Sequence, residues 1–178
     1  LTTATIPVGF VFTTTLDDVS YQFVTTAEHT TRVANNVIRF TDIPIYEGTY
    51  VTNRYTVDSQ NVEQKFTLNS DRADTTTLLV DVFDSASATT STTFTLTDDL
   101  TVVKANSNNY FLQESIDGKF EVYFGDGIVG KKLSDGNVVR LRYVVTNKTE
   151  ANGALSFSSS GEISGVTDFD ILTVTSAE

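Results

Sequence analysis

The residues best suited to chemistry lie in one glycine-rich stretch. Residues 124–137 read FGDGIVGKKLSDGN and satisfy two nucleotide-binding patterns at once. Gly125, Gly127 and Gly130 spell G-x-G-x-x-G, while Gly125, Gly130 and Lys131 spell the start of a phosphate loop, G-x-x-x-x-G-K. Both patterns hold phosphate with backbone N–H groups at the start of a helix. The stretch is therefore either a nucleotide site or a turn.

The residues after the third glycine favour the turn. A phosphate loop needs Ser or Thr after its lysine to hold magnesium, and Lys132 stands there instead. The dinucleotide pattern needs a helix and, about 20 positions on, an acidic residue, but KKLSDGNVVRLRYVV reads as a second turn and a strand. The other motifs of a protein kinase are missing. We expect a connector in which Asp126 and Asp135 close turns on the backbone, and no cofactor.

Other reactive side chains form no recognisable constellation. His29 is the single histidine, and no serine lies in a strand–turn–helix elbow, so a catalytic triad has no basis. Asp17-Asp18 and Asp98-Asp99 are paired carboxylates, but neighbours on a strand face opposite ways and neither pair belongs to a calcium loop. The chain also has no Cys. We expect no catalytic residue and no metal site, and hence no enzyme.

Charge and hydropathy exclude two classes of partner. The 178 residues carry 23 acidic and 12 basic side chains, a net charge of −11, which disfavours nucleic acid. The closest basic pairs, Lys131-Lys132 and Arg140 with Arg142, are expected on turn flanks and solvated strand faces. No apolar run approaches the roughly 18 residues of a membrane span. The chain starts with Leu and contains no Met, and its first residues, LTTATIPVGF, lack the charged and apolar regions of a signal peptide, so we expect an excised domain or fragment.

Alternation of apolar and polar residues predicts strands throughout. In KFEVYF, Phe120, Val122 and Phe124 share one face, and in VVRLRYVV the apolar residues oppose the two arginines. Asp117-Gly118, a dipeptide that adopts positive φ angles, predicts a β-hairpin from Tyr110 to Phe124. Thr and Val are abundant, these and the aromatic residues favour strands, and no helical stripe is present. We expect an all-β protein, an antiparallel β-sandwich with a second small β-domain and little or no helix.

Composition shifts suggest where the domains divide. The segments IPIYEGTY, at 43–50, and NKTEANGALSFSSS, at 147–160, interrupt the strand pattern. Strand-like sequence lies on both sides of the centre, so we expect one domain inserted into another. Residues 1–44 plus 153–178 would form the small domain, and residues 45–152 the inserted sandwich.

Several motifs in fixed order resemble a known family. YFLQES, FGDGIVGKKL, the strand GNVVRLRY and the closing NG follow one another between Tyr110 and Gly153. Upstream, ATIPVGFVFTT and YQFVTTAE are similar to that family's entry strands. The segment resembles the baseplate wedge proteins of T4-like contractile-tailed phages, the baseplate J-like family, whose members extend beyond both ends of this chain.

The resemblance implies a structural rather than a catalytic role. It predicts a baseplate wedge component in the virion, assembled in the host bacterial cytoplasm, that contacts other wedge proteins and further copies of itself. It implies neither nucleic acid nor membrane as a partner. Because acidic charge opposes association, we expect the isolated chain to be monomeric or weakly dimeric. The alternative is a Thr-rich β-sandwich module of a bacterial surface adhesin, which has the same composition.

Overall fold

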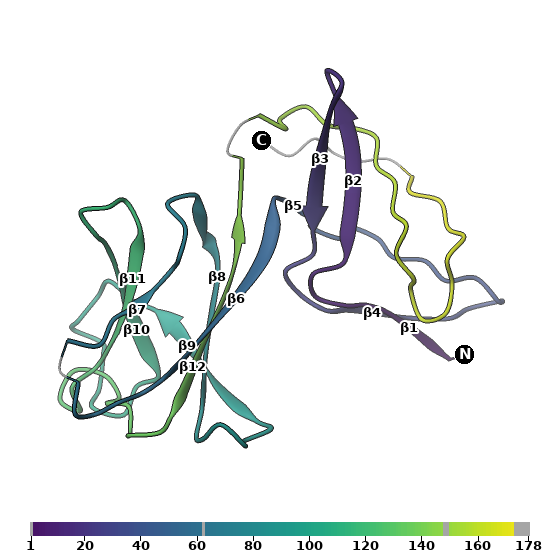
Figure 1. Ribbon diagram of the computed structural model, residues 1–178. Helices are drawn as coiled ribbons and strands as arrows, with labels where there is room; N and C mark the ends of the chain where they lie inside the picture. The colour runs from purple at the N-terminus through teal and green to yellow at the C-terminus, as the bar shows by residue number, and fades with distance from the viewer. Residues whose placement is uncertain (1, 62, 148–149, 173–178) are drawn as a thin grey trace. The chain divides into compact units, whose positions relative to one another are not determined.

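The structure is a computed structural model that describes residues 2–61, 63–147 and 150–172 (Figure 1). All regular elements among these residues are strands, which confirms the all-β class. The chain divides into two compact units, Leu1–Tyr50 with Val144–Glu178, and Val51–Tyr143. The sequence predicted borders after residue 44 and before residue 153, and the independence of the two domains stays a prediction.

The larger unit is built on a single seven-stranded sheet. Its strand order is β6-β12-β8-β9-β10-β11-β7, so β6 and β7 are the two edges. The strands are β6 (Thr49–Thr56), β7 (Phe66–Thr67), β8 (Ala73–Phe83), β9 (Ser91–Leu96), β10 (Asn109–Glu114), β11 (Phe120–Phe124) and β12 (Val138–Val145). The sheet curls into a nearly closed barrel, where the sequence predicted two packed sheets. Alternation along a strand specifies one buried face, which is the same in both architectures.

Side chains join the two edges of this sheet. The Tyr55 hydroxyl on β6 donates to the Thr67 carbonyl on β7 over 2.6 Å. The Tyr143 hydroxyl on β12 donates to Asn53 Oδ1 on β6 over 2.6 Å and accepts from the Asn69 N–H, just after β7, over 2.9 Å. Burial is the main cause that raises the pKa of both phenols, so both hydroxyls keep their protons. The closure is therefore made by hydroxyl groups.

Aromatic rings fill the inside of the curled sheet. Edge-to-face contacts run from Tyr55 to Phe66, from Phe66 to Phe124 and from Phe124 to Phe94, at centroid distances of 5.8, 5.4 and 5.3 Å. These rings come from β6, β7, β11 and β9, so one stack spans the interior between distant strands. Val139, Leu141 and Tyr143 of β12 are fully buried, as the alternation in VVRLRYVV predicted.

The predicted hairpin from Tyr110 to Phe124 is confirmed. Strands β10 and β11 pair antiparallel from Tyr110 opposite Phe124 to Glu114 opposite Phe120. The turn differs in one respect, because Gly118 has a positive φ of 76° and Asp117 does not. The N–H of Gly118 donates to the Ser115 carbonyl over 3.0 Å, which gives a longer loop with the glycine in the left-handed position.

The smaller unit contains two short sheets. One pairs two strands, β1 (Thr3–Ile6) and β4 (His29–Arg32), and the other has the order β2-β3-β5. The strands of the second sheet are β2 (Val11–Leu16), β3 (Val19–Val24) and β5 (Tyr46–Glu47). A two-residue turn joins β2 to β3, and its residues Asp17 and Asp18 both have positive φ, 49° and 63°. This is the geometry of a type I′ hairpin turn.

Residues after β12 complete the core of the smaller unit. Phe157 packs edge-to-face on Phe23 at 4.8 Å, and Phe169 lies 6.3 Å from Phe10. Gly161 passes so close to Phe10 that an added Cβ would lie 2.6 Å from the ring. The sequence predicted strands in this segment, but its described residues, 150–172, form only isolated bridges. Packing on the hairpin, rather than a ladder, holds the segment.

The closure of the sheet can be tested at Tyr143. Tyr143→Phe leaves the Asn69 N–H and the Asn53 side chain without their partner, so we expect a loss of about 1–3 kcal/mol in the free energy of unfolding. Tyr46→Phe, on a more exposed tyrosine, should change it by less than about 0.5 kcal/mol. Urea unfolding of both variants measures the difference. Equal effects would show that the Tyr143 hydroxyl does not stabilise the sheet.

Candidate functional site

The glycine segment connects β11 to β12, and its backbone donors are already bonded. Five consecutive N–H groups, from Gly127 to Lys131, each have an acceptor within the larger unit. The bonds are Gly127 N to Gly130 O at 3.0 Å, Ile128 N and Val129 N to Asp126 Oδ1 at 2.8 and 2.9 Å, Gly130 N to Lys104 O at 3.2 Å, and Lys131 N to Ser107 O at 3.0 Å.

The carboxylate of Asp126 accepts from two of the backbone N–H groups that a phosphate loop would offer to its ligand. Bonds from the N–H groups of Val129 and Ile128 lower the pKa of Asp126, so the carboxylate stays charged. No helix begins after Gly130, since the chain runs through turns to β12. A phosphate loop works through free N–H groups at a helix start. The geometry is therefore that of a closed connector.

Two glycines of the segment are required for different reasons. Gly127 has φ of 92°, a region that favours glycine, and an added Cβ would make only an ordinary contact, 3.6 Å from Lys132 Cβ. Gly125 instead lies against the backbone of Gly130, where an added Cβ would be 2.2 Å from the carbonyl carbon. The expected role of Asp135 differs, because its carboxylate accepts from the Ser59 N–H, far away in the sequence, over 2.9 Å.

The remaining candidates have structural surroundings. Asp17 and Asp18 form the hairpin tip, and His29 pairs with Ile6 in the β1–β4 ribbon. The Asp99 carboxylate accepts from the N–H and the hydroxyl of Thr101. Across residues 2–61, 63–147 and 150–172, no three acidic or histidine side chains gather around a point that could hold a metal ion. The same residues contain no helix long and apolar enough to span a membrane.

A buried aspartate on β8 was not predicted from the sequence. Asp81 Oδ2 accepts from Arg140 at 2.9 Å and from Arg142 at 2.8 Å, and Oδ1 accepts from the Thr93 hydroxyl at 2.9 Å. The two arginines are only about a quarter exposed, with values of 25% and 21%, so the expectation of a solvated strand face was wrong. Asp81 lies between Val80 and Val82 in the sequence, and a polar residue between two apolar ones on a strand normally faces solvent.

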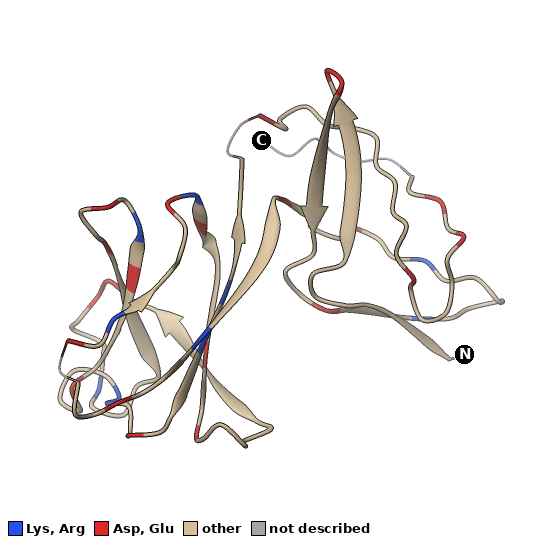
Figure 2. Ribbon diagram, viewed as in Figure 1, with Lys and Arg blue, Asp and Glu red and all other residues tan. Residues whose placement is uncertain are grey.

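Arginines also cover an aromatic ring on this face. The guanidinium groups of Arg140 and Arg54 lie 4.8 and 5.1 Å from the centre of the Phe83 ring. Lys and Arg positions are accordingly visible on β6 and β12 in Figure 2. The cluster binds strands β6, β12, β8 and β9 together on the outside of the sheet. Its guanidinium groups therefore contact Asp81 or the Phe83 ring within the larger unit.

Apolar side chains are exposed where the glycine segment meets the loop before β10. The backbone bonds to Lys104 and Ser107 hold these two loops side by side. Val102 is 67% exposed and Ile128 is 77% exposed. Single exposed apolar side chains on loops are ordinary on protein surfaces, so these two residues do not by themselves define a binding site.

The closed state of the glycine segment predicts how its variants behave. Gly125→Ala should lower the free energy of unfolding by about 1–3 kcal/mol, because the new methyl group forces two backbone segments apart. Lys131→Ala should be nearly silent, and magnesium with ATP should leave the melting temperature unchanged. Thermal melts with and without the nucleotide measure both. A shift of several degrees with ATP, lost in Lys131→Ala, would contradict the connector.

The Asp81 cluster predicts a dependence of stability on pH. Burial raises the pKa of Asp81, but the bonds from Arg140 and Thr93 and the charge of Arg142 lower it by more, so it lies below its ordinary value. Its contribution is therefore present above the unfolded pKa of about 3.9 and is lost as pH falls through the lower, folded pKa.

Asp81→Asn removes that contribution at neutral pH. We expect it to lower the free energy of unfolding by roughly 1.5–3 kcal/mol at pH 7, and the gap to the unchanged protein should narrow below about pH 4. Asp84→Asn, on the exposed loop after β8, should change stability by less than about 0.5 kcal/mol. Urea unfolding across this pH range checks both. A gap of constant size would exclude the charge of Asp81 as its cause.

Comparison with known proteins finds a similarity over part of the chain. No family model matches the chain. The chain is similar to the baseplate wedge protein gp6 of Enterobacteria phage T4, with 29% identity over 82 residues. The match covers 38% of this chain and 12% of the length of that protein. The similarity supports a relationship to a phage baseplate protein.

Proposed function

We propose that the chain is a structural module of a phage tail baseplate wedge and acts through protein–protein contacts without catalysis. The observation that carries this proposal is the similarity to the T4 wedge protein gp6. The expected place of action is the baseplate of a contractile tail, assembled in the cytoplasm of the host bacterium. The partners would be other wedge proteins and further copies of this chain.

The structure supports this proposal because the motif residues have structural positions. Between Tyr110 and Gly153, the segments that resemble wedge proteins form a hairpin, a closed turn and strand β12. Each of these parts builds the sheet or joins its strands. Such a segment provides a rigid frame, and exposed loops and sheet edges are the parts that remain for contact with partners.

Tail particles provide the test. In the phage whose genome carries this sequence, the chain should co-purify with tails, and immunogold against it should label the tail end that holds the baseplate. Disruption of the gene should stop tail assembly, because a missing wedge component leaves the ring incomplete. The label on the bacterial surface, with normal tails after disruption, would overturn the proposal and favour the adhesin.

A further inference from the structure

We propose that strand β2 has an edge at Thr15 that no residue within 2–61, 63–147 or 150–172 pairs with, and that this edge receives an extended segment of another tail protein as an added strand. The inference rests on the proposed function for the identity of the partner. The edge itself follows from the hydrogen bonds of the smaller unit. Addition of a strand to a free edge is a common mode of protein recognition.

The backbone of β2 alternates between its two neighbours. The N–H of Thr25 donates to the Phe10 carbonyl, just before β2. The backbone N–H and C=O groups of the even-numbered residues of β2 therefore point toward β3. Thr13 faces the other way, because its N–H donates to the Ser158 carbonyl at 2.8 Å and its carbonyl accepts from the Ser158 N–H at 2.9 Å. Thr15 lies two residues further along β2 and so presents its N–H and carbonyl on the same outer edge as Thr13.

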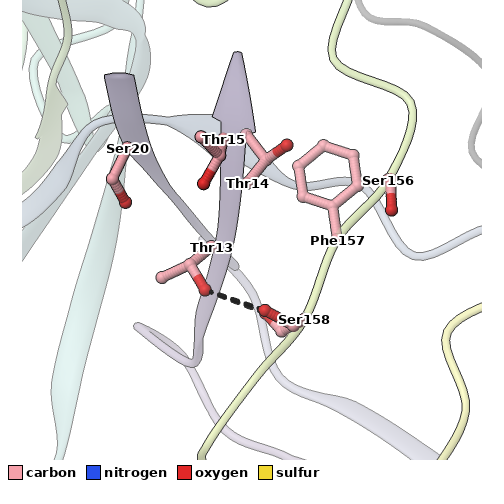
Figure 3. Close-up of a pocket in the computed structure, with 7 residues that line it drawn as sticks. All are labelled: Thr13, Thr14, Thr15, Ser20, Ser156, Phe157 and Ser158. Atoms are coloured by element: carbon pink, nitrogen blue, oxygen red, sulfur yellow. Dashed lines mark hydrogen bonds between the residues drawn. The ribbon is translucent and has the colours of Figure 1, made fainter. Parts of the chain in front are cut away.

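The segment that covers Thr13 ends its pairing before Thr15. Thr13 and Ser158 form an isolated bridge, and continued antiparallel pairing would place Ser156 opposite Thr15. The segment departs from β2 instead and leaves an open hollow of about 310 Å³ (Figure 3). Hydroxyl-bearing residues form most of its lining: Thr13, Thr14, Thr15, Ser20, Ser156 and Ser158, with Phe157. A peptide backbone matches such a lining, because it offers a donor and an acceptor at each residue.

The surroundings of the hollow indicate the chemistry of the added segment. Asp17 and Asp18 form the tip next to Thr15, and the tip of this hairpin is acidic in Figure 2. Val19 and Leu155, the sequence neighbours of the lining residues Ser20 and Ser156, are 50% and 62% exposed. We therefore expect an extended segment with an apolar residue and a Lys or Arg that reaches the tip. The same acidic tip opposes pairing of two identical edges, which accords with a monomeric isolated chain.

The test removes one hydrogen-bond donor from the edge. Proline is tolerated on an edge strand where the missing N–H faces outward, so Thr15→Pro should keep a melting temperature close to that of the unchanged chain. Thr15→Val is the matched control, because it changes the side chain and keeps the N–H. In phage that carry each variant, mass spectrometry of purified tails should show at least about a tenfold loss of Thr15→Pro and normal incorporation of Thr15→Val.

A second replacement covers the case in which proline strains the strand. An ester in place of the Thr14–Thr15 peptide bond, introduced by ligation, removes the same N–H without fixing φ. The ester also weakens the Thr14 carbonyl, which faces β3, so the melting temperature should fall only slightly. A fall as large as that caused by an ester in place of the Thr13–Thr14 bond, which removes the Thr14 N–H from the β2–β3 ladder, would place the Thr15 N–H in that ladder too and overturn the inference.

The other outcomes separate this inference from the proposed function. Normal incorporation of Thr15→Pro would overturn the open edge as a docking site and leave the baseplate role standing. Absence of the unchanged chain from tails would overturn both. A dimer of the isolated chain in light scattering that Thr15→Pro abolishes would show that the edge binds a second copy of the chain. This result would overturn the assignment of the edge to a different tail protein.

Discussion

The larger unit depends on two tyrosine hydroxyls that join β6 and β12 to the region of β7 and so close the curled sheet. Tyr55 links edge strand β6 to edge strand β7, and Tyr143, which also bonds to Asn53 on β6, links β12 to Asn69, two residues after β7. Without these bonds the sheet would keep two open edges and a partly exposed aromatic interior. Buried phenols need partners for their hydroxyl groups, so the barrel and its hydrogen bonds stabilise each other.

Hydrogen bonds within the chain also determine what the glycine segment can do. Its N–H groups are bonded to Asp126, to Gly130 and to the loop before β10, so the pattern that resembles a nucleotide site works as a joint between strands. The backbone N–H groups of this segment therefore bond within the larger unit. An assembly role fits a frame of this kind, because its exposed parts are loop rims and, in the smaller unit, a short stretch of sheet edge.

Local features were predictable from the sequence, and distant pairings were not. The hairpin from Tyr110 to Phe124 and the connector role of Gly125 follow from residues close to one another in the chain. The parallel pairing of β9 with β10 and the meeting of β6 with β7 depend on how seven strands curl, which alternation does not encode. Asp81 was missed because a polar residue between apolar ones has the same pattern whether it faces solvent or two arginines.

The glycine segment is closed by bonds within the chain, and this closure makes it part of a structural frame. Amide hydrogen exchange of the isolated protein, read residue by residue by NMR, measures the closure. We expect slow exchange for the five N–H groups from Gly127 to Lys131, with no change when magnesium and ATP are added. Fast exchange that becomes slow with the nucleotide would contradict it.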